Sequence, residues 1–262
     1  MRSQLDTLTR NRADSLLSPD GRRLRKVLSF SGLTAYNTCP RKYEFWELQR
    51  QTERTSIDSP QSLGRIVHGL VDSADRETLS QLKSAVKSKQ ISRLKEDAVR
   101  KIADHLRREL NRISQPLYLT DAKHEFTLSN FDGTSGWLML AKADVILERL
   151  NPRSRSRSLE IVEMKSSTRG RDQAIQQALL AAYTLAGALG LGRVPIWVLS
   201  PGMTAFQTAY LKSSPLPQIV ADFRKVASKI EESFLRSEFI ARPGAYCRNC
   251  PFREICSVGI SL

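Results

Sequence analysis

Two carboxylates and a lysine in the middle of the chain are spaced so that they could meet at one end of a β-sheet. Glu163 and Lys165 lie in the otherwise apolar segment 159–165, and because strand side chains alternate, both point to the same face. Asp144 lies 19 residues before Glu163, in a second segment with a strand pattern. If the two strands pair as a hairpin, we expect the carboxylates of Asp144 and Glu163 to converge.

Such a set has the chemistry of a metal site. Two nearby carboxylates repel each other unless a cation lies between them, and hard oxygen ligands suit Mg²⁺ or Mn²⁺. The metal lowers the pKa of a bound water and stabilises the charge that develops on a phosphodiester, and a neighbouring lysine helps to position or deprotonate that water. We therefore interpret the three residues as a candidate site for phosphodiester hydrolysis. A surface ion pair is the alternative explanation.

The predicted strand that carries Asp144, residues 137–148, has a polar and an apolar face. Lys142 shares the face of Asp144, two residues away. We expect one continuous apolar face opposite, made of Met139, Ala141, Ala143, Val145 and Leu147.

Three further polar residues lie on predicted helices. His68 is on the flank of the apolar stripe of residues 63–74, where a histidine packed in the core is the more frequent case. Gln176 and Tyr183 lie on nearly the same face of residues 172–189, although ordinary helix surface explains them equally well.

The four cysteines indicate a second site. Cys247, Cys250 and Cys256 form a C-x2-C-x5-C pattern, whereas Cys39 lies 208 residues before Cys247. Four cysteines in a chain of 262 residues are too few for a secreted disulfide scaffold. In a cytosolic chain, a close group of thiolates indicates a metal or cluster site.

The composition of the chain points to a polyanionic partner. It has 41 Lys and Arg against 27 Asp and Glu, a formal net charge of +14 and a pI near 10.0. With 40% hydrophobic and 26% charged residues, it is neither a disordered chain nor a membrane protein. No apolar run approaches the ~20 residues of a membrane span and no secretory signal is visible, so we expect a cytoplasmic protein. Nucleic acid is the commonest intracellular polyanion; a merely soluble basic protein is the alternative.

The elements that must position these residues alternate between helices and strands. Residues 1–27 are expected to form a basic, mobile arm. Ser31 is the expected N-cap of a helix over residues 32–47, which Pro40 should kink or divide. Further helices are predicted at 172–189, 216–235 and about 75–115, and strands at 124–131, 137–148, 159–165, 194–199 and 204–211. This order predicts one mixed α/β domain with an inserted helical region.

The positive charge must lie mostly outside a metal site that is itself acidic. We expect it to form a track that leads phosphates to the site. Its contributors would be the basic helices of residues 83–112, the loop of residues 153–157 and the N-terminal arm.

Together these segments resemble the PD-(D/E)XK nuclease superfamily, in its RecB-type branch with an iron–sulfur cluster. That branch includes the AddB nuclease domain and the CRISPR-associated adaptation exonucleases. The resemblance is carried by an opening helix with Cys39 (residues 30–45), the segment Leu63-Gly64-Arg65-Ile66-Val67-His68, Lys142-Ala143-Asp144, Glu163-Met164-Lys165, and the cysteine-bearing tail of residues 247–256.

The resemblance implies a fold and a set of site residues. The fold would be restriction-endonuclease-like, a mixed central sheet flanked by helices, in a single domain over residues 28–262 with a cluster-binding C-terminal tail. His68, Asp144, Glu163 and the backbone carbonyl of Met164 would hold Mg²⁺ or Mn²⁺, and Lys165 would activate the attacking water. The remaining implied residues are the ligands of a 4Fe–4S cluster, Cys39, Cys247, Cys250 and Cys256, and the DNA contacts Tyr183, Gln176 and Lys142.

The implied activity is that of a metal-dependent DNA nuclease, expected to be an exonuclease acting on single strands. Its expected partners are DNA and a helicase or a CRISPR adaptation integrase, with no membrane. Four cysteines alone would suit zinc, but a distant single cysteine joined to a triplet favours a 4Fe–4S cluster. The alternative is a non-catalytic nucleic-acid-binding module or accessory subunit that uses the cluster as a structural clip.

One feature departs from the family pattern. The family has Gln-x-x-x-Tyr on the helix after the lysine, but here Leu179 lies four residues before Tyr183. The nearest glutamines are Gln176 and Gln177, and Gln176 is expected to take the DNA-contacting role because it shares the face of Tyr183.

Overall fold

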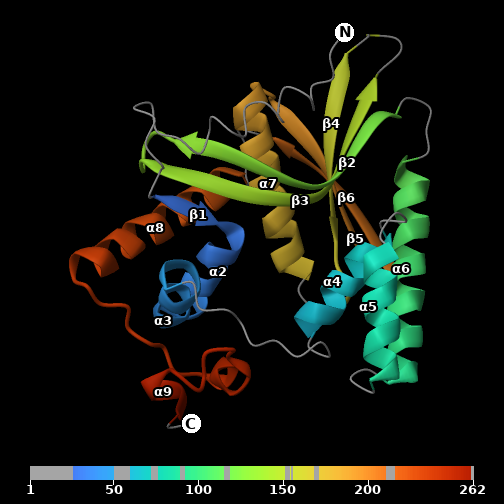
Figure 1. The fold of residues 1–262 in the computed structure, drawn as a ribbon. Coiled ribbons are helices and arrows are strands. Elements are labelled where there is room, and N and C mark those ends of the chain that lie inside the picture. The colour runs from blue at the N-terminus through green and yellow to red at the C-terminus, as the bar shows by residue number, and fades with distance from the viewer. Residues whose placement is uncertain are drawn as a thin grey trace.

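The computed structural model describes residues 26–49, 60–71, 76–88, 92–114, 119–150, 154, 156–167, 171–210 and 216–260. The N-terminal arm expected over residues 1–27 lies outside the described residues up to residue 25. A twisted mixed sheet of six strands forms the centre, with helices on both of its faces (Figure 1). Within the described ranges, no helix is long and apolar enough to cross a membrane.

The sheet follows the order β1-β3-β4-β5-β6, and β2 pairs with β3 off this path. β1 is parallel to β3 and β4 is parallel to β5, whereas the other pairs are antiparallel. The strands are β1 (Val27–Ser29), β2 (Leu119–Asp132), β3 (Trp137–Leu150), β4 (Arg157–Met164), β5 (Arg193–Ser200) and β6 (Met203–Tyr210). The mixed α/β prediction is therefore confirmed.

The strand β3 has three partners, which leaves an opening along one of its edges. β2 pairs along nearly its whole length on one side, so β1 and β4 must share the other side. β1 pairs with β3 only as far as Leu140, and β4 pairs with it only from Val145 onward. Among the described strands, none pairs with residues 141–144 on this edge. Asp144 lies in that opening, where β1 and β4 both end.

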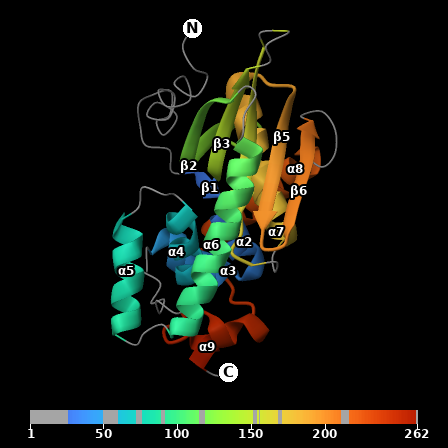
Figure 2. The ribbon, with the colours of Figure 1, turned by 90° about the vertical axis from the view of Figure 1, so that its right-hand side faces the viewer.

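Helices cover the sheet in two layers, each with its own hydrophobic core. One core joins the sheet to α2, α7 and α8, and the other joins it to α4, α5 and α6. Figure 2 shows α6 running across the second face. The helices are α2 (Phe30–Thr38), α3 (Pro40–Tyr43), the π-helix η1 (Glu44–Leu48), α4 (Pro60–Val71), α5 (Arg76–Lys87), α6 (Arg93–Ser114), α7 (Arg171–Leu189), α8 (Leu216–Leu235), the 3₁₀ helix η2 (Ala245–Asn249) and α9 (Ser257–Ile260).

Two local predictions about the first helix have different outcomes. Pro40 divides the predicted helix, since α2 ends at Thr38 and α3 begins at Pro40. The predicted N-cap, Ser31, is wrong. Ser29 is the cap: its backbone is extended, and its Oγ accepts a hydrogen bond from the N–H of Gly32 at 3.0 Å. Ser31 already lies inside the helix, so it cannot supply the extended backbone that a cap needs.

The prediction of one continuous apolar face on β3 is also wrong. Met139, Ala141 and Ala143 pack in the core of α2, α7 and α8, whereas Val145 and Leu147 pack in the core of α4, α5 and α6. The division falls at the opening in the edge of β3, where the neighbouring strand changes from β1 to β4.

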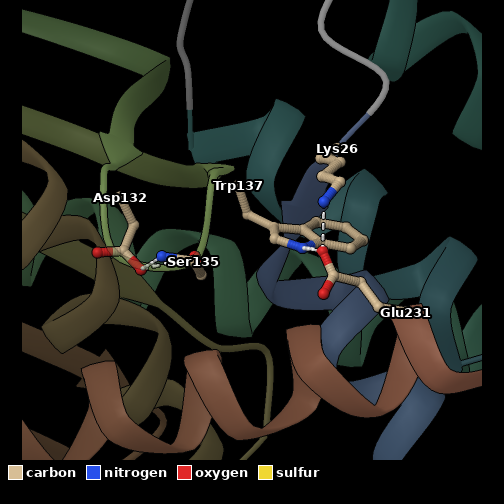
Figure 3. A network of polar contacts seen from close by, with 5 residues as sticks. All are labelled: Lys26, Asp132, Ser135, Trp137 and Glu231. Atoms are coloured by element: carbon tan, nitrogen blue, oxygen red, sulfur yellow. Dashed lines mark hydrogen bonds and ion pairs between the residues drawn. The ribbon is translucent and has the colours of Figure 1, made fainter.

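Polar contacts fasten the start of β3 and the chain before β1 to α8. Glu231 accepts hydrogen bonds on one oxygen from Lys26 Nζ at 2.5 Å and from Trp137 Nε1 at 3.0 Å (Figure 3). In the adjacent turn, the carboxylate of Asp132 accepts from the backbone N–H and the hydroxyl of Ser135, at 3.1 and 2.6 Å. These contacts fix the turn between β2 and β3 against the helix.

Asp132 also forms a two-point ion pair with Arg224 of α8, at 2.9 and 2.7 Å. The guanidinium of Arg224 lowers the pKa of Asp132 from 3.8 to about 2. We expect Asp132→Asn to destabilise the protein by about 2 kcal/mol and to lower Tm by roughly 4–8 °C. Because the folded-state pKa is depressed, this stabilisation is present above about pH 4 and is lost as the pH falls toward 2. Thermal unfolding at pH 7 and pH 3 measures both effects.

The matched control is Asp222→Asn. Asp222 is exposed on the same helix, and its carboxylate accepts a hydrogen bond from Gln218. It should change Tm little at either pH, since an exposed contact of this kind contributes little. An equal decrease in Tm for the two variants would contradict the prediction. So would a decrease for Asp132→Asn that is as large at pH 3 as at pH 7.

Candidate active site

The structure brings Asp144, Glu163 and Lys165 together at the opening in the edge of β3. The N–H of Met164 donates to Asp144 Oδ2 at 2.7 Å, so the Asp144 carboxylate is fixed against the last residue of β4. Lys165 Nζ contacts Glu163 Oε1 at 2.5 Å, which shows that the two side chains lie on the same side. The backbone N–H of Lys165 donates to the carbonyl of Leu199 in β5 at 2.8 Å. Backbone contacts on both sides therefore hold the end of β4 in place.

His68 reaches the same site from α4. Its Nδ1 lies 3.4 Å from Asp144 Oδ1. One turn earlier in the helix, Gly64 faces the loop after β4: a Cβ at Gly64 would lie 3.4 Å from the Oγ of Ser166. At this position α4 lies against the loop after β4, and His68, one turn later in the helix, lies beside Asp144.

The two carboxylates have opposite electrostatic surroundings. Burial and the charge of Asp144 raise the pKa of Glu163 well above its ordinary value, although Lys165 opposes the shift. Burial also opposes ionisation of Asp144, but the contacts with His68 and with the N–H of Met164 outweigh it and hold the pKa of Asp144 below its ordinary value. Glu163 Oε2 is buried and has no hydrogen-bond partner. A buried carboxylate oxygen without a partner is costly, and a cation is the group that would satisfy it.

The residues at this site suit a hard divalent cation. Oxygen donors from Asp144 and Glu163 with one imidazole from His68 are ligands that Mg²⁺ or Mn²⁺ accepts. In the part of the chain that is described, no three His, Cys, Asp or Glu side chains lie close enough together to hold a metal ion as they stand. Lys165 Nζ lies 2.5 Å from Glu163 Oε1 and His68 Nδ1 lies 3.4 Å from Asp144 Oδ1, so these two side chains take positions beside the carboxylates that a metal would otherwise occupy.

A cavity of about 490 Å³ opens onto the site. His68 and Lys165 line it, together with Gly64 and Ser166 from the contact described above. The rest of its wall comes from α2, α3 and η1 on one side and from the start of α7 on the other. The volume falls within the roughly 300–1,000 Å³ that is typical of ligand sites.

The glutamine beside the lysine is Gln177, whereas the predicted DNA contact is Gln176. Gln177 Oε1 lies 3.2 Å from Lys165 Nζ, and Gln177 lines the cavity with Gln173. Gln176 is exposed and is not among the residues that line the cavity. The signal that could have found Gln177 is its spacing of four residues from Gln173, which puts both on one helix face.

The other two predicted DNA contacts lie apart from the cavity wall. Tyr183 is half-buried, packs against the core of α2, α7 and α8, and lies near Arg224. Lys142 is exposed on β3, and its charge favours ionisation of Glu163, which places it near the carboxylates.

One predicted member of the phosphate track, Arg157, is engaged in an ion pair instead. Its Nη1 donates to the buried carboxylate of Glu148 at 2.7 Å across the β3–β4 pair. A guanidinium held this way stabilises the sheet, so Arg157 is not available to a passing phosphate. On α6, the arginines at positions 100, 107 and 112 each contact a carboxylate within the helix, namely Glu96, Asp104 and Glu109.

The four cysteines line one small cavity between α3 and the C-terminal tail. All four are free thiols, and the backbone N–H of Arg242 lies 3.4 Å from the sulfur of Cys39. Aromatic contacts hold the tail there: the rings of Phe45 and Phe252 lie 5.6 Å apart. In Figure 1 the tail with α9 lies directly beside α3. Cys39 thus lines the same cavity as the distant triplet Cys247, Cys250 and Cys256.

Comparisons with known proteins place the chain in a family. Residues 27–257 match the family described as the PD-(D/E)XK nuclease superfamily. A solved protein from Eubacterium rectale named "Putative exonuclease" is 12% identical over 95% of this chain and 92% of its own, with a TM-score of 0.58. The crystal structure of SSO0001 is 14% identical and covers 98% of both chains, with a TM-score of 0.44. No protein with a curated description matches the chain.

The first of these structures shares the fold of the chain, and the family match spans the sheet, the candidate site and the cysteine-bearing tail. The six-stranded mixed sheet between helical layers is the restriction-endonuclease-like fold of that family. The chain belongs to the PD-(D/E)XK nuclease superfamily.

Proposed function

We propose that the protein is a metal-dependent deoxyribonuclease that acts on single strands as an exonuclease. One observation carries the proposal: Asp144 and Glu163 lie buried beside Lys165, which lines a cavity, and one buried oxygen of Glu163 lacks a partner. Membership in a nuclease superfamily supports phosphodiester hydrolysis. The name of the E. rectale protein supports an exonuclease.

In the proposed mechanism, each residue has a distinct task. Asp144, Glu163, His68 and the backbone carbonyl of Met164 would hold Mg²⁺ or Mn²⁺, which supplies an acidified water and stabilises charge on the phosphodiester. Lys165 would orient the attacking water with its ammonium group. Gln177 Oε1, 3.2 Å from Lys165 Nζ, would keep that ammonium aimed at the cavity. The N–H of Met164 holds Asp144 in the orientation that faces His68.

We further propose that Cys39, Cys247, Cys250 and Cys256 hold a 4Fe–4S cluster. The support is that four free thiols from two ends of the chain line one cavity. The cluster would tie α3 to the tail, and thiolate ligation would then contribute directly to folding. A reducing compartment such as the cytoplasm would keep these thiols available.

The proposal includes a partner that exposes single strands. The sequence contains no Gly-x-x-x-x-Gly-Lys-Ser/Thr element, so ATP-driven unwinding would come from a helicase. A CRISPR adaptation integrase is the other partner that the family resemblance implies. Tyr183 and Lys142 are proposed to contact the strand outside the cavity.

The decisive experiment is the cleavage of end-labelled DNA. Single strands blocked at the 5′ or 3′ end, and a blunt duplex, are incubated with the protein in Mg²⁺, in Mn²⁺ and in chelator. We expect single strands to shorten stepwise from one end with either metal and to stay intact in chelator. Binding without cleavage under all conditions would favour the non-catalytic alternative, and equal cleavage of the duplex would remove the single-strand assignment.

A further inference from the structure

One wall of the cavity carries a regular stripe of side chains that the proposed mechanism does not use. Along α2, α3 and η1, every third or fourth residue lines the cavity. The stripe consists of Ser31, Thr34, Thr38, Lys42 and Trp46. It begins with small hydroxyl side chains and ends with a cation and an indole.

Trp46 lies between the hydrophobic core and the cavity. Part of its side chain packs against the core of α2, α7 and α8, and the residue also lines the cavity. Lys42 Nζ lies 5.6 Å from the centre of the Trp46 ring, within the range of a cation–π contact. The indole is therefore held between the core and the Lys42 ammonium, which lies over its ring.

The same segment is anchored from behind by the tail. Lys42 also lines the cavity of the four cysteines, as does Phe45, which packs on Phe252. Trp46 follows Phe45 directly in η1. Because one face of this short segment meets the tail and the other meets the active-site cavity, the position of Trp46 is set by rigid contacts.

An indole with a neighbouring ammonium has the chemistry that recognises one unstacked nucleotide. Nucleobases stack on aromatic side chains irrespective of sequence, and a lysine neutralises the phosphate that follows. A base that is paired within a duplex is stacked on both faces and cannot reach a ring inside a cavity. Only a single strand, or a frayed end, can place a base there.

We propose that this stripe binds one unpaired nucleotide of the DNA strand whose adjacent phosphodiester lies at Lys165. The base stacks on Trp46 in the place of the Lys42 ammonium, which turns from the ring to the phosphate of the same nucleotide. The hydroxyl groups of Ser31 and Thr34 line the path to the site. This inference rests on the proposed nuclease function and names the residues that make it selective for single strands.

The test measures binding apart from cleavage. In a Lys165→Ala background, the affinity for a fluorescein-labelled oligothymidylate and for a blunt hairpin duplex is measured by anisotropy. We expect Trp46→Ala to weaken binding of the single strand about tenfold, the order expected for loss of one stacked base. Trp46→Phe should restore most of it, and the affinity for the duplex should change little. Phe206→Ala, an exposed aromatic residue outside the cavity, is the matched control.

Three outcomes would contradict the proposed role of the stripe: an unchanged single-strand affinity in Trp46→Ala, an equal loss of single-strand affinity in Phe206→Ala, or an equal loss of duplex affinity in Trp46→Ala. Circular dichroism and thermal unfolding show whether each variant is folded. If Trp46→Ala does not fold, the test uses Trp46→Phe in its place. A wild-type protein that cleaves no DNA would instead refute the nuclease, while selective loss of single-strand binding in Trp46→Ala would still support the stripe.

Discussion

Replacing Lys165 by alanine is expected to lower the rate of single-strand cleavage by roughly 10²–10³-fold, the usual loss when one positioned hydrogen-bond donor is removed from an active site. Lys165 Nζ is the cation closest to the buried Glu163 carboxylate, at 2.5 Å, and it lines the cavity where the phosphodiester would lie. The alanine variant loses this ammonium but keeps the backbone contact between residue 165 and Leu199. The fold should therefore persist. Single-turnover cleavage of an end-labelled strand, with circular dichroism for folding, measures both.

Lys225→Ala provides the comparison, because Lys225 is an exposed lysine on α8 that does not line the cavity. It removes the same charge from a chain whose net charge is +14 and should leave the cleavage rate nearly unchanged. If Lys165→Ala cleaves at the wild-type rate, the catalytic assignment of Lys165 is wrong. If both variants lose activity equally, the effect is one of overall charge.

The second large effect is expected for Cys256→Ala. If four cysteines hold an iron–sulfur cluster, loss of one ligand should remove the broad visible absorbance and the brown colour of protein purified without oxygen. Because the cluster would join α3 to the tail, we also expect Tm to fall by roughly 10 °C or more. Iron and acid-labile sulfide analysis, visible spectra and thermal unfolding measure these changes.

Ile255→Ala is the control for this prediction, since Ile255 is the preceding residue and its side chain is 53% exposed. It should keep both the colour and the stability. If the wild-type protein contains zinc and no iron, the four cysteines form a zinc site and not an iron–sulfur cluster. Lys165→Ala should stay brown, which separates the cluster from catalysis.

Much of the architecture was predictable because its signals are local. Alternating and helical periods gave the positions of β2–β6, α7 and α8 within a few residues, and the faces of Glu163 and Lys165 followed from the two-residue period of a strand. The convergence of Asp144 and Glu163 was conditional on a hairpin, and the antiparallel register of β3 and β4 satisfies that condition.

Other features depend on contacts between distant segments, which no local pattern contains. β1 has three residues, too few to show a period, and its parallel pairing with β3 determines where the opening at Asp144 begins. The choice between Gln176 and Gln177 depends on how α7 is rotated against the sheet. The stripe that ends at Trp46 could not be predicted because Pro40 and the π-helix η1 change the helical phase between α2 and Trp46.

The contacts between α2 and α8 have a consequence for the order in which a newly made chain can become active. The hydroxyl of Tyr36 reaches the carbonyl of Lys229 at 2.8 Å, and Lys26 pairs with Glu231, so the first elements of the fold rest on nearly the last helix. On the ribosome, β1 can pair with β3 earlier, but the contacts of Lys26 and Tyr36 with α8 can form only after residues 229–231 have been made. Since α2 and η1 form a wall of the cavity, an incomplete chain would carry the proposed catalytic residues of β3 and β4 without the complete cavity in which we propose that DNA binds.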